Sequence, residues 1–364
     1  MPDRPIAVIC AHNPKNAGMY RVDLAARRYF EARGLRADLF VTQGRTGIGT
    51  LRFDFLRDVE QLGAYDRVVY WGDFLNNPLW GLRDYAGRQR PDGSVSSVDE
   101  WRSLYLEAKQ RHPALRVIVA GGCALGAAAC RDDPELAAAY RGFLQSADAL
   151  VLRDPGSVAE VHQWLGPDRR VQLGFDCAAL APPAVAPKAA RRGPFFVHGF
   201  GRGLPPADAA ALVAETERHT GLRGVPVSWL GREGPRVTFG ARVAWRLGWA
   251  RHAHFCLTDI YHFSLCSMSV GTPAFVVTTP ETRVDGTLNQ HKKRLLFDML
   301  GLQSMHLDWT PRWREDLEPM LHGWQRLADE DAPWSCSFQA GRERLLGRLD
   351  QLFMPARSGR PIVT

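Results

Sequence analysis

Two polar segments that each follow a predicted strand carry side chains suited to binding a sugar. The first segment, residues 11–19, supplies His12, Asn13 and Asn16. Backbone amides at such a glycine-containing turn can bind an anion, and these three side chains could hold a hydroxylated acceptor. An ordinary polar turn, in which Gly18 is needed only for its backbone, explains the same residues, so both interpretations stay open.

The second segment, residues 69–77, is an apolar run that ends in Gly, Asp and two Asn. Asp73 could act as a base or bind sugar hydroxyls, and Trp71 could stack on a sugar ring. We place Asn76 with them on the acceptor side. A capping aspartate beside a core tryptophan is the alternative interpretation.

Cationic and amide groups at two other strand ends predict an anion-binding site. Arg153 ends one predicted strand and is followed by Asp154, and Ser157 is placed to cap the next helix. Arg153 could contact a substrate, or it could pair with Asp154 and fix the turn. A glycine-rich loop further along offers the Gly201 amide and Arg202, which could together bind an anion.

A histidine at the start of a predicted helix is the candidate acid or base. His262 and Tyr261 lie in the first turn, where the helix dipole favours an anion and an imidazole can exchange a proton. A structural histidine is the alternative. Lys292 and Lys293 open a later predicted helix, and they could neutralise a phosphate or form a solvated face.

We expect neither a metal nor a bound nucleotide cofactor. Four possible metal ligands, His252, His254, Asp259 and His262, have a spacing that crosses a strand and fits no standard motif. The glycine groups match neither the dinucleotide fingerprint nor the P-loop. The seven cysteines are odd in number and lack CxxC spacing, which predicts buried free thiols in a reducing cytosol.

The elements that position these residues read as two α/β halves. Short apolar runs such as 6–10, 149–152 and 226–230 alternate with amphipathic stretches such as Val22 to Arg33, which predicts doubly wound parallel sheets. We expect an N-terminal acceptor-side domain over residues 1–180, a Pro- and Ala-rich linker over 181–194, and a donor-side domain over 195–364. Because open α/β sheets bind ligands at the carboxyl ends of their strands, the cleft between the halves suits a transferase.

The amino-acid composition predicts which partners the protein binds and where in the cell it lies. The 364 residues are 45% apolar and 23% charged, which excludes general disorder. A formal net charge of +7 favours anionic partners, such as phosphorylated metabolites or acidic glycans. We see no signal peptide and no apolar run of membrane-spanning length, so we expect a cytoplasmic protein, with peripheral membrane contact left open.

The order of these motifs resembles the polysaccharide pyruvyl transferase family. The resemblance runs from about Ala11 to Leu302 and rests on short motifs. These are Arg153-Asp154 with Ser157, Leu173-Gly174-Phe175-Asp176, Thr258-Asp259-Ile260-Tyr261-His262, Gly271-Thr272-Pro273, and the Lys292/Lys293 helix that ends in Leu300-Gly301-Leu302. The resemblance implies a GT-B-like fold and transfer of a pyruvyl group from phosphoenolpyruvate, as co-substrate, to sugar hydroxyls of a cell-surface or capsular glycan or its lipid-linked precursor.

Carried over by position, the resemblance makes His262 the acid/base and Arg153 an anion binder. Arg202 would help to bind the donor, and Asp73 with Asn16 would serve the acceptor. One position departs from the family: members commonly carry an arginine two residues before the histidine, and Ile260 stands there. The phosphate would then be held by other cations, such as Arg202, Lys292 or Lys293, or the donor differs.

Two rival functions remain. A GT-B glycosyltransferase that uses a nucleotide sugar would share this architecture, because a fold does not fix the donor. The isoleucine at position 260 favours this rival, and the lack of a clear glutamate-rich ribose motif weakens it. A basic glycan- or nucleic-acid-binding protein is the non-enzyme alternative; we expect an enzyme without a nucleic-acid partner.

Overall fold

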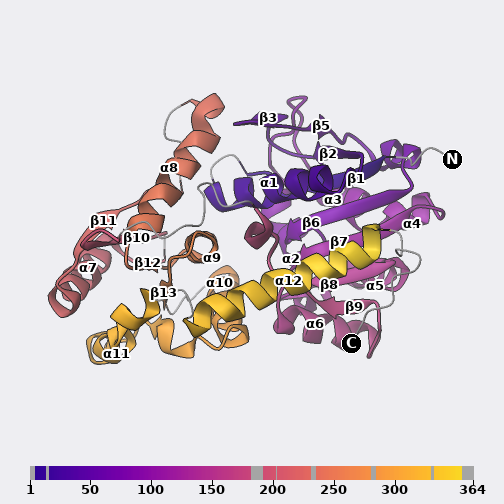
Figure 1. The fold of residues 1–364 in the computed structure, drawn as a ribbon. Coiled ribbons are helices and arrows are strands. Elements are labelled where there is room, and N and C mark those ends of the chain that lie inside the picture. The colour runs from indigo at the N-terminus through magenta and orange to yellow at the C-terminus, as the bar shows by residue number, and fades with distance from the viewer. Residues whose placement is uncertain are drawn as a thin grey trace, which may run out of the picture.

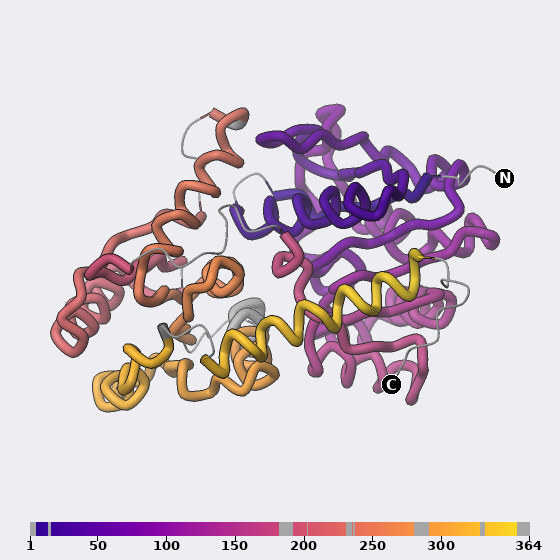
Figure 2. Tube along the Cα trace, viewed as in Figure 1, coloured from indigo at the N-terminus to yellow at the C-terminus, as the bar shows by residue number. Residues whose placement is uncertain are grey.

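The chain folds into two α/β units that lie side by side (Figure 1). The computed structural model describes residues 5–13, 16–181, 192–201, 203–230, 235–279, 284–328 and 332–354. Figure 2 shows that the chain completes the first unit before it builds the second, and that the last helix then runs back to the first. Most of the expected linker, residues 182–191, lies outside the described residues.

The first unit is a seven-stranded parallel sheet with the strand order β5-β2-β1-β6-β7-β8-β9. Its strands are β1 (Ile6–Cys10), β2 (Ala37–Val41), β5 (Asp54–Phe55), β6 (Arg67–Asp73), β7 (Arg116–Gly122), β8 (Ala149–Leu152) and β9 (Val171–Leu173). A small antiparallel pair, β3 (Gly47–Ile48) and β4 (Leu51–Arg52), lies in the loop after β2. Since β1 pairs with both β2 and β6, the strand order reverses at β1, which is where ligands bind in such sheets.

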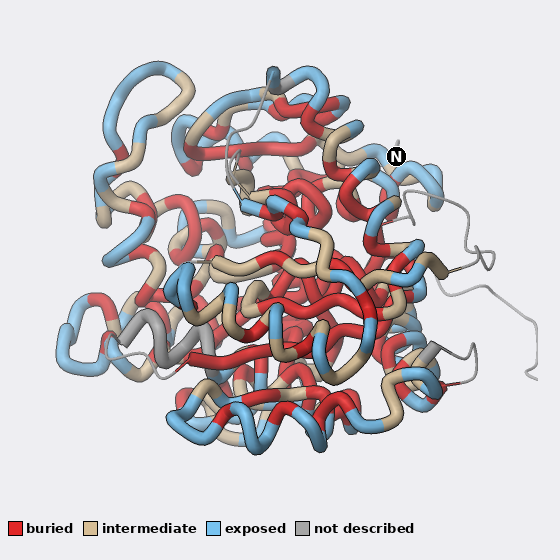
Figure 3. Tube along the Cα trace, turned by 90° about the vertical axis from the view of Figure 1, so that its left-hand side faces the viewer, coloured by how far each residue is buried: buried red, intermediate tan, exposed pale blue. Residues whose placement is uncertain are grey.

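Helices cover both faces of the first sheet. They are α1 (Ala17–Ala32), α2 (Pro78–Trp80), α3 (Val98–Tyr105), α4 (Ala108–Arg111), α5 (Pro134–Ser146) and α6 (Pro155–Leu165). Figure 3 shows buried segments enclosed by exposed ones, and burial on both faces explains the continuous apolar runs of the strands. One cap differs from the prediction: Asp154, not Ser157, caps α6 by accepting from the Ser157 N–H at 2.7 Å, because Pro155 starts the helix earlier.

The second unit is a five-stranded parallel sheet with the order β11-β10-β12-β13-β14. Its strands are β10 (Phe195–Gly199), β11 (Arg223–Pro226), β12 (Cys256–Thr258), β13 (Ala274–Thr278) and β14 (His306–Asp308). Its helices are α7 (Pro206–Thr220), α8 (Phe239–His252), α9 (Tyr261–Ser269), α10 (Val284–Met299) and α11 (Trp313–Leu321). We had expected a strand to begin at Pro226; β11 ends there instead, since proline cannot donate to a neighbouring strand.

The last helix, α12 (Pro333–Phe353), runs from the second unit back to the first and packs there against α1, although we had placed all of 195–364 in the second domain. Asp350 accepts hydrogen bonds from Tyr29 Oη at 2.9 Å and from Arg33 Nη2 at 3.0 Å, both on α1. The ring of Phe353 lies edge-on to Phe30, with 5.3 Å between centroids. The chain therefore crosses between the units twice, and α12 ties them together.

Candidate functional site

A cavity of about 380 Å³ opens at the carboxyl ends of β1, β2 and β6, where the first sheet reverses its strand order. The second unit contributes one side chain to it, Lys292 of α10. The other lining residues are Cys10, Ala11, His12, Asn13, Asn16, Met19, Val41, Thr42, Gln43, Asp73, Phe74, Leu75, Trp80, Asp84, Arg88 and Tyr105. The expected residues His12, Asn13, Asn16, Asp73 and Lys292 thus meet in one cavity between the units.

His12 is held at the edge of this cavity by an acidic residue behind it. Its side chain is 2% exposed, and its Nδ1 lies 3.7 Å from Asp23 Oδ2. The ring packs against Phe53 at 4.9 Å between centroids. Its Nε2 is buried and has no hydrogen-bond partner among the described residues. A carboxylate that faces one ring nitrogen and leaves the other available is the usual arrangement of a histidine base.

Asp23 was not predicted, and its position follows from where α1 begins. Asn16 caps the helix by accepting from the Gly18 N–H at 2.9 Å, so α1 starts at Ala17 and not near Val22 as we had expected. Asp23 then falls in the second turn, fully buried. Burial raises the pKa of Asp23, while His12 acts in the opposite direction. An aspartate on the apolar face of a helix was the available sequence signal.

Asp73 ends β6 in a strained conformation. Its φ of 52° is positive, which it alone shows among the described non-glycine residues. The Asp73 carboxylate accepts from Arg153 Nη1 at 3.0 Å, and its side chain is 21% exposed. Backbone strain often accompanies a functional position, and here it turns a carboxylate toward the cavity edge.

Arg153 is enclosed by carboxylates and aromatic rings. Besides Asp73, its Nη1 lies 3.3 Å from Asp176 Oδ2, and its Nε lies 3.6 Å from Asp154 Oδ2. The side chain is 0% exposed, and the guanidinium carbon sits 5.0 Å from the ring centroid of Tyr261. We had expected Arg153 to bind the donor; in this structure its charge is already neutralised within the protein.

His262, from the second unit, joins the buried network of charged side chains that surrounds Arg153. Its Nε2 lies 3.6 Å from Asp176 Oδ2, and the residue is 6% exposed. Gly18 covers it so closely that a Cβ at position 18 would fall 2.2 Å from the His262 Cβ. Burial would raise the pKa of Asp176, but His262 and Arg153 outweigh it and lower that pKa. His262 is not among the residues that line the cavity, and its catalytic role stays a prediction.

The two lysines of α10 point in different directions. Lys292 Nζ lies 5.4 Å from the ring centroids of both Phe74 and Tyr261, at the cavity. Burial and the charge of Arg153 lower the pKa of Lys292. Lys293 is buried and donates to the backbone oxygens of Asp259 and Val277, at the ends of β12 and β13. Of this pair, Lys292 is therefore the one available to an anion.

Gly201, Asn76 and Trp71 serve other purposes in this structure. The Gly201 N–H donates to Asp259 Oδ1 at 2.5 Å, so a protein carboxylate occupies the amide we had expected to bind the donor. Arg202 lies outside the described residues. Asn76 donates to the Tyr105 backbone oxygen and turns away from the cavity. The sugar-stacking role of Trp71 is wrong: its indole is fully buried beneath α1 and donates to the Val22 oxygen at 3.0 Å.

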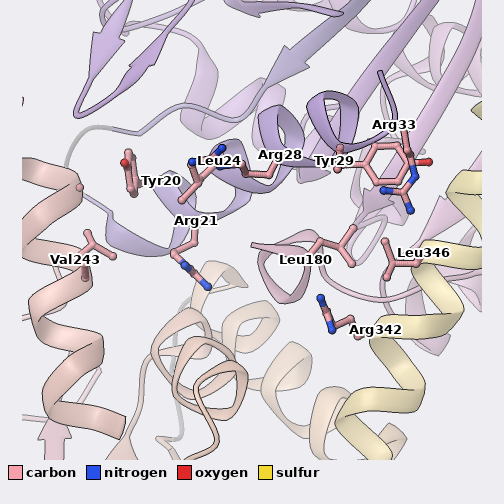
Figure 4. Close-up of a pocket in the computed structure, with 13 residues that line it drawn as sticks. Tyr20, Arg21, Leu24, Arg28, Tyr29, Arg33, Leu180, Val243, Arg342 and Leu346 are labelled. Atoms are coloured by element: carbon pink, nitrogen blue, oxygen red, sulfur yellow. The ribbon is translucent and has the colours of Figure 1, made fainter. Parts of the chain in front are cut away.

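A larger cavity, about 730 Å³, lies on another side of α1, between that helix, α8 and α12. Arg21 and Arg342 project into it (Figure 4). Two further arginines on its wall are paired with carboxylates, Arg28 with Glu31 and Arg33 with Asp350. The smaller cavity is the better candidate site, because it combines a histidine, a carboxylate and a lysine at the sheet edge where strand order reverses.

Three further findings concern possible metal ligands, cysteines and membrane-spanning helices among the described residues. Those residues hold no group of three or more His, Cys, Asp or Glu side chains arranged to bind a metal. All seven cysteines are free thiols, and all except Cys336 are buried. Among the described helices, none is long and apolar enough to span a bilayer.

Comparisons with known proteins support the fold. No family model matches the chain, and no curated protein matches it. Solved structures do match along nearly the whole chain. The UDP-GlcNAc 2-epimerase of Methanocaldococcus jannaschii has a TM-score of 0.56 and 9% identity, covering 96% of this chain and 99% of that one. A putative UDP-N-acetylglucosamine 2-epimerase of Listeria monocytogenes has a TM-score of 0.52 and 10% identity, covering 96% and 97%.

The S. aureus MnaA–UDP structure is similar in the same way, with a TM-score of 0.51, 10% identity and 96% of each chain covered. At such identities the likeness concerns the fold. The chain therefore has the expected GT-B-like arrangement, in which two Rossmann-like units face each other across a cleft.

Proposed function

We propose that this protein is a GT-B enzyme that transfers a sugar from a nucleotide-sugar donor to a hydroxyl of a glycan acceptor. The observation that carries the proposal is the buried His12–Asp23 pair at the end of β1, with His12 in a cavity that Lys292 of the second unit also lines. Such a cavity places a proton acceptor from one unit near a cation from the other.

The similar solved structures support the choice of donor. The M. jannaschii epimerase was also solved in complex with UDP-GlcNAc and UDP, at a TM-score of 0.51 to this chain. That enzyme and this chain share the two-unit architecture, and we carry the donor class, a nucleotide sugar, over as part of the proposal. A donor of this kind bears a diphosphate, which agrees with the basic balance of the sequence.

The chemistry assigns one task to each side chain. His12 Nε2 accepts the proton of the acceptor hydroxyl while Asp23 stabilises the imidazolium. The hydroxyl oxygen forms a bond to the anomeric carbon of the donor, and the bond from that carbon to the diphosphate oxygen breaks. The departing nucleoside diphosphate keeps the electron pair, and Lys292 offsets its negative charge. Asn13 and Asp73 line the cavity where the acceptor hydroxyls would bind.

Pyruvyl transfer from phosphoenolpyruvate is the second candidate. The observation that favours it is the cationic pair of Lys292 and Arg153, both stacked near Tyr261, because this donor carries a carboxylate and a phosphate on a small skeleton. Against it stand Ile260, where the family carries an arginine, and the ion pairs that Arg153 already makes with Asp73, Asp154 and Asp176. A cytoplasmic location stays a prediction for either function.

A thermal-shift screen tests the donor class. The purified protein is heated alone, with a panel of nucleotides and nucleotide sugars, and with phosphoenolpyruvate. A ligand at about 100 times its dissociation constant adds roughly 2.7 kcal/mol to the free energy of unfolding. We expect a rise in Tm with a nucleotide sugar, and a smaller rise in the Lys292→Ala variant.

Three other results would argue against this proposal. A rise in Tm with phosphoenolpyruvate and with no other compound would favour pyruvyl transfer. Stabilisation by a nucleotide sugar that is merely converted to its epimer, without release of nucleotide, would make the protein an epimerase. No shift with any compound, in a protein that unfolds cooperatively, would reject both candidate donors.

A further inference from the structure

The outer face of α8 is an exposed apolar surface. Seven large apolar side chains are exposed among the described residues, and four of these fall between residues 230 and 249. The most exposed are Val237 at 76% and Trp245 at 66%, and Trp249 is 37% exposed. Single exposed apolar residues are common on proteins, but a cluster on one segment marks an interaction surface.

The helix geometry explains why the two tryptophans form one face of α8. Trp245 and Trp249 are one turn apart, and their rings meet edge-on at 5.9 Å between centroids. The opposite side of α8 carries Phe239, Val243 and Leu247, which are buried in the protein core. The helix thus has an inner face that fills the core and an outer aromatic face that is open to solvent. Figure 1 shows α8 extending beyond the sheet of the second unit, on the side toward the first unit, where Phe239 meets Tyr20 of α1 edge-on at 5.5 Å between centroids.

The charge of this segment identifies the kind of partner. Between Leu230 and His254 the sequence has five arginines, of which Arg246 is buried, and one acidic residue, Glu233, so the segment carries a net positive charge. A second copy of the chain on this face would bring like charges together, which opposes self-association. An anionic surface would be attracted to it, and tryptophans on an exposed, projecting helix suit the headgroup layer of a bilayer.

We propose that α8 is a membrane-docking helix that binds an anionic lipid bilayer. Trp245 and Trp249 enter the headgroup region, and the arginines of the segment attract acidic headgroups. Docking would hold the cavity at a membrane surface, where a lipid-linked acceptor is found. The docking proposal stands on α8 alone, so it can hold or fail separately from the proposed chemistry.

Vesicle co-sedimentation tests the proposal. The intact protein is mixed with phosphatidylcholine vesicles, with and without phosphatidylglycerol, and the bound fraction is measured. We expect binding only when phosphatidylglycerol is present. The binding should weaken with added salt, because the Debye length falls from about 10 Å at 0.1 M to about 3 Å at 1 M.

Two variants locate the contact. Trp245→Ala should reduce the partition coefficient at least about tenfold, and Trp245→Ala with Trp249→Ala should reduce it further. Val95→Ala is the matched control, because Val95 is also 66% exposed but lies in the first unit. It should bind vesicles like the wild type. All variants should keep the donor turnover of the wild type, since none of these residues lines the cavity.

Several results would overturn the proposal. Absence of vesicle binding by the wild type would remove it, as would binding that both tryptophan variants retain. Binding to pure phosphatidylcholine vesicles that does not change with salt would contradict the proposed attraction between the arginines and acidic headgroups. A dimer in analytical ultracentrifugation that Trp245→Ala dissociates would instead make this face a contact between two copies.

Discussion

Gly18 of α1 packs directly against His262 of α9, so closely that a Cβ atom at position 18 would fall 2.2 Å from the Cβ of His262. The two helices belong to different units, and their first turns meet here. This contact buries His262 beside Asp176 and closes the ion-pair network around Arg153. A residue without a side chain is therefore what lets the two units approach at this point.

Gly18→Ala should weaken the contact between the units. Overpacking of a close contact costs about 1–3 kcal/mol, and the strain here falls between α1 and α9. Chemical denaturation should show a lower free energy of unfolding. Gly347→Ala on α12 is the control: no heavy atom within 4 Å would meet the new Cβ, and alanine should be neutral or stabilising. Equal stability of the two variants would show that the units do not meet at Gly18.

His12→Asn should lower donor turnover by about two orders of magnitude or more, since general base catalysis contributes roughly 10²–10⁴-fold. The Tm should fall by what the ring's packing against Phe53 contributes, whereas the removed Nε2 has no hydrogen-bond partner among the described residues. His322→Asn, on an exposed residue, should behave like the wild type. Full turnover in a folded His12→Asn protein would remove His12 from the mechanism.

Asp23→Asn should reduce activity without reducing stability. Burial raises the pKa of Asp23, so the folded state binds its proton more tightly than the unfolded state does. The stability that this group contributes is present below the unfolded pKa and is lost as pH rises through the folded pKa; each tenfold difference in proton affinity corresponds to about 1.4 kcal/mol. At neutral pH the variant should therefore unfold at the same or a higher temperature. A clear drop in Tm would show that the carboxylate stabilises the fold.

Arg153→Met should destabilise the protein strongly. The substitution leaves Asp73, Asp154 and Asp176 without their shared cation, and breaking a buried ion pair costs about 3–5 kcal/mol. Denaturant titration measures the loss. Arg312→Ala breaks an exposed pair with Glu315 and should cost no more than about 1 kcal/mol. A similar small cost at Arg153, with donor affinity lost, would restore Arg153 as a donor-binding residue.

As the pH rises, donor binding should weaken below the pH at which an ordinary lysine loses its charge. Because burial and Arg153 lower the pKa of Lys292, its positive charge is lost earlier as pH rises. The KM of the wild type for the donor should rise with increasing pH, and it should do so below the pH at which an ordinary lysine loses its charge. The KM should stay flat in Lys292→Arg, whose guanidinium remains charged. Lys109→Arg, on a lysine paired with Asp148, should keep the wild-type profile, and identical profiles for all three proteins would exclude Lys292 from donor binding.

The sequence predicted the strands better than the loops and caps. The apolar runs 6–10 and 149–152 correspond to β1 and β8, because strands buried on both faces are apolar throughout. The helix starts were less predictable, since a polar side chain decides them. Asn16 begins α1 five residues before the expected Val22, and this shift brings Asp23 into the second turn, against His12.

The site was only partly predictable for an electrostatic reason. Residues at the carboxyl ends of strands were found, and His12, Asp73 and Lys292 do share a cavity. Pairing of Arg153 with Asp154 was one of the two interpretations of its sequence, but a sequence does not show that Asp73 and Asp176, at other strand ends, join this pair. Trp71 was misassigned because alternate residues of β6 face opposite sides of the sheet, and position 71 faces α1.

Sugar transfer with His12 as the base can be tested by measuring nucleoside diphosphate release from a panel of nucleotide sugars, by the wild type and by His12→Asn. We expect release by the wild type with at least one donor, increased by a hydroxylated acceptor. We also expect a rate lower by about two orders of magnitude in the variant. Release of phosphate from phosphoenolpyruvate, with every nucleotide sugar left intact, would instead exclude sugar transfer and favour pyruvyl transfer.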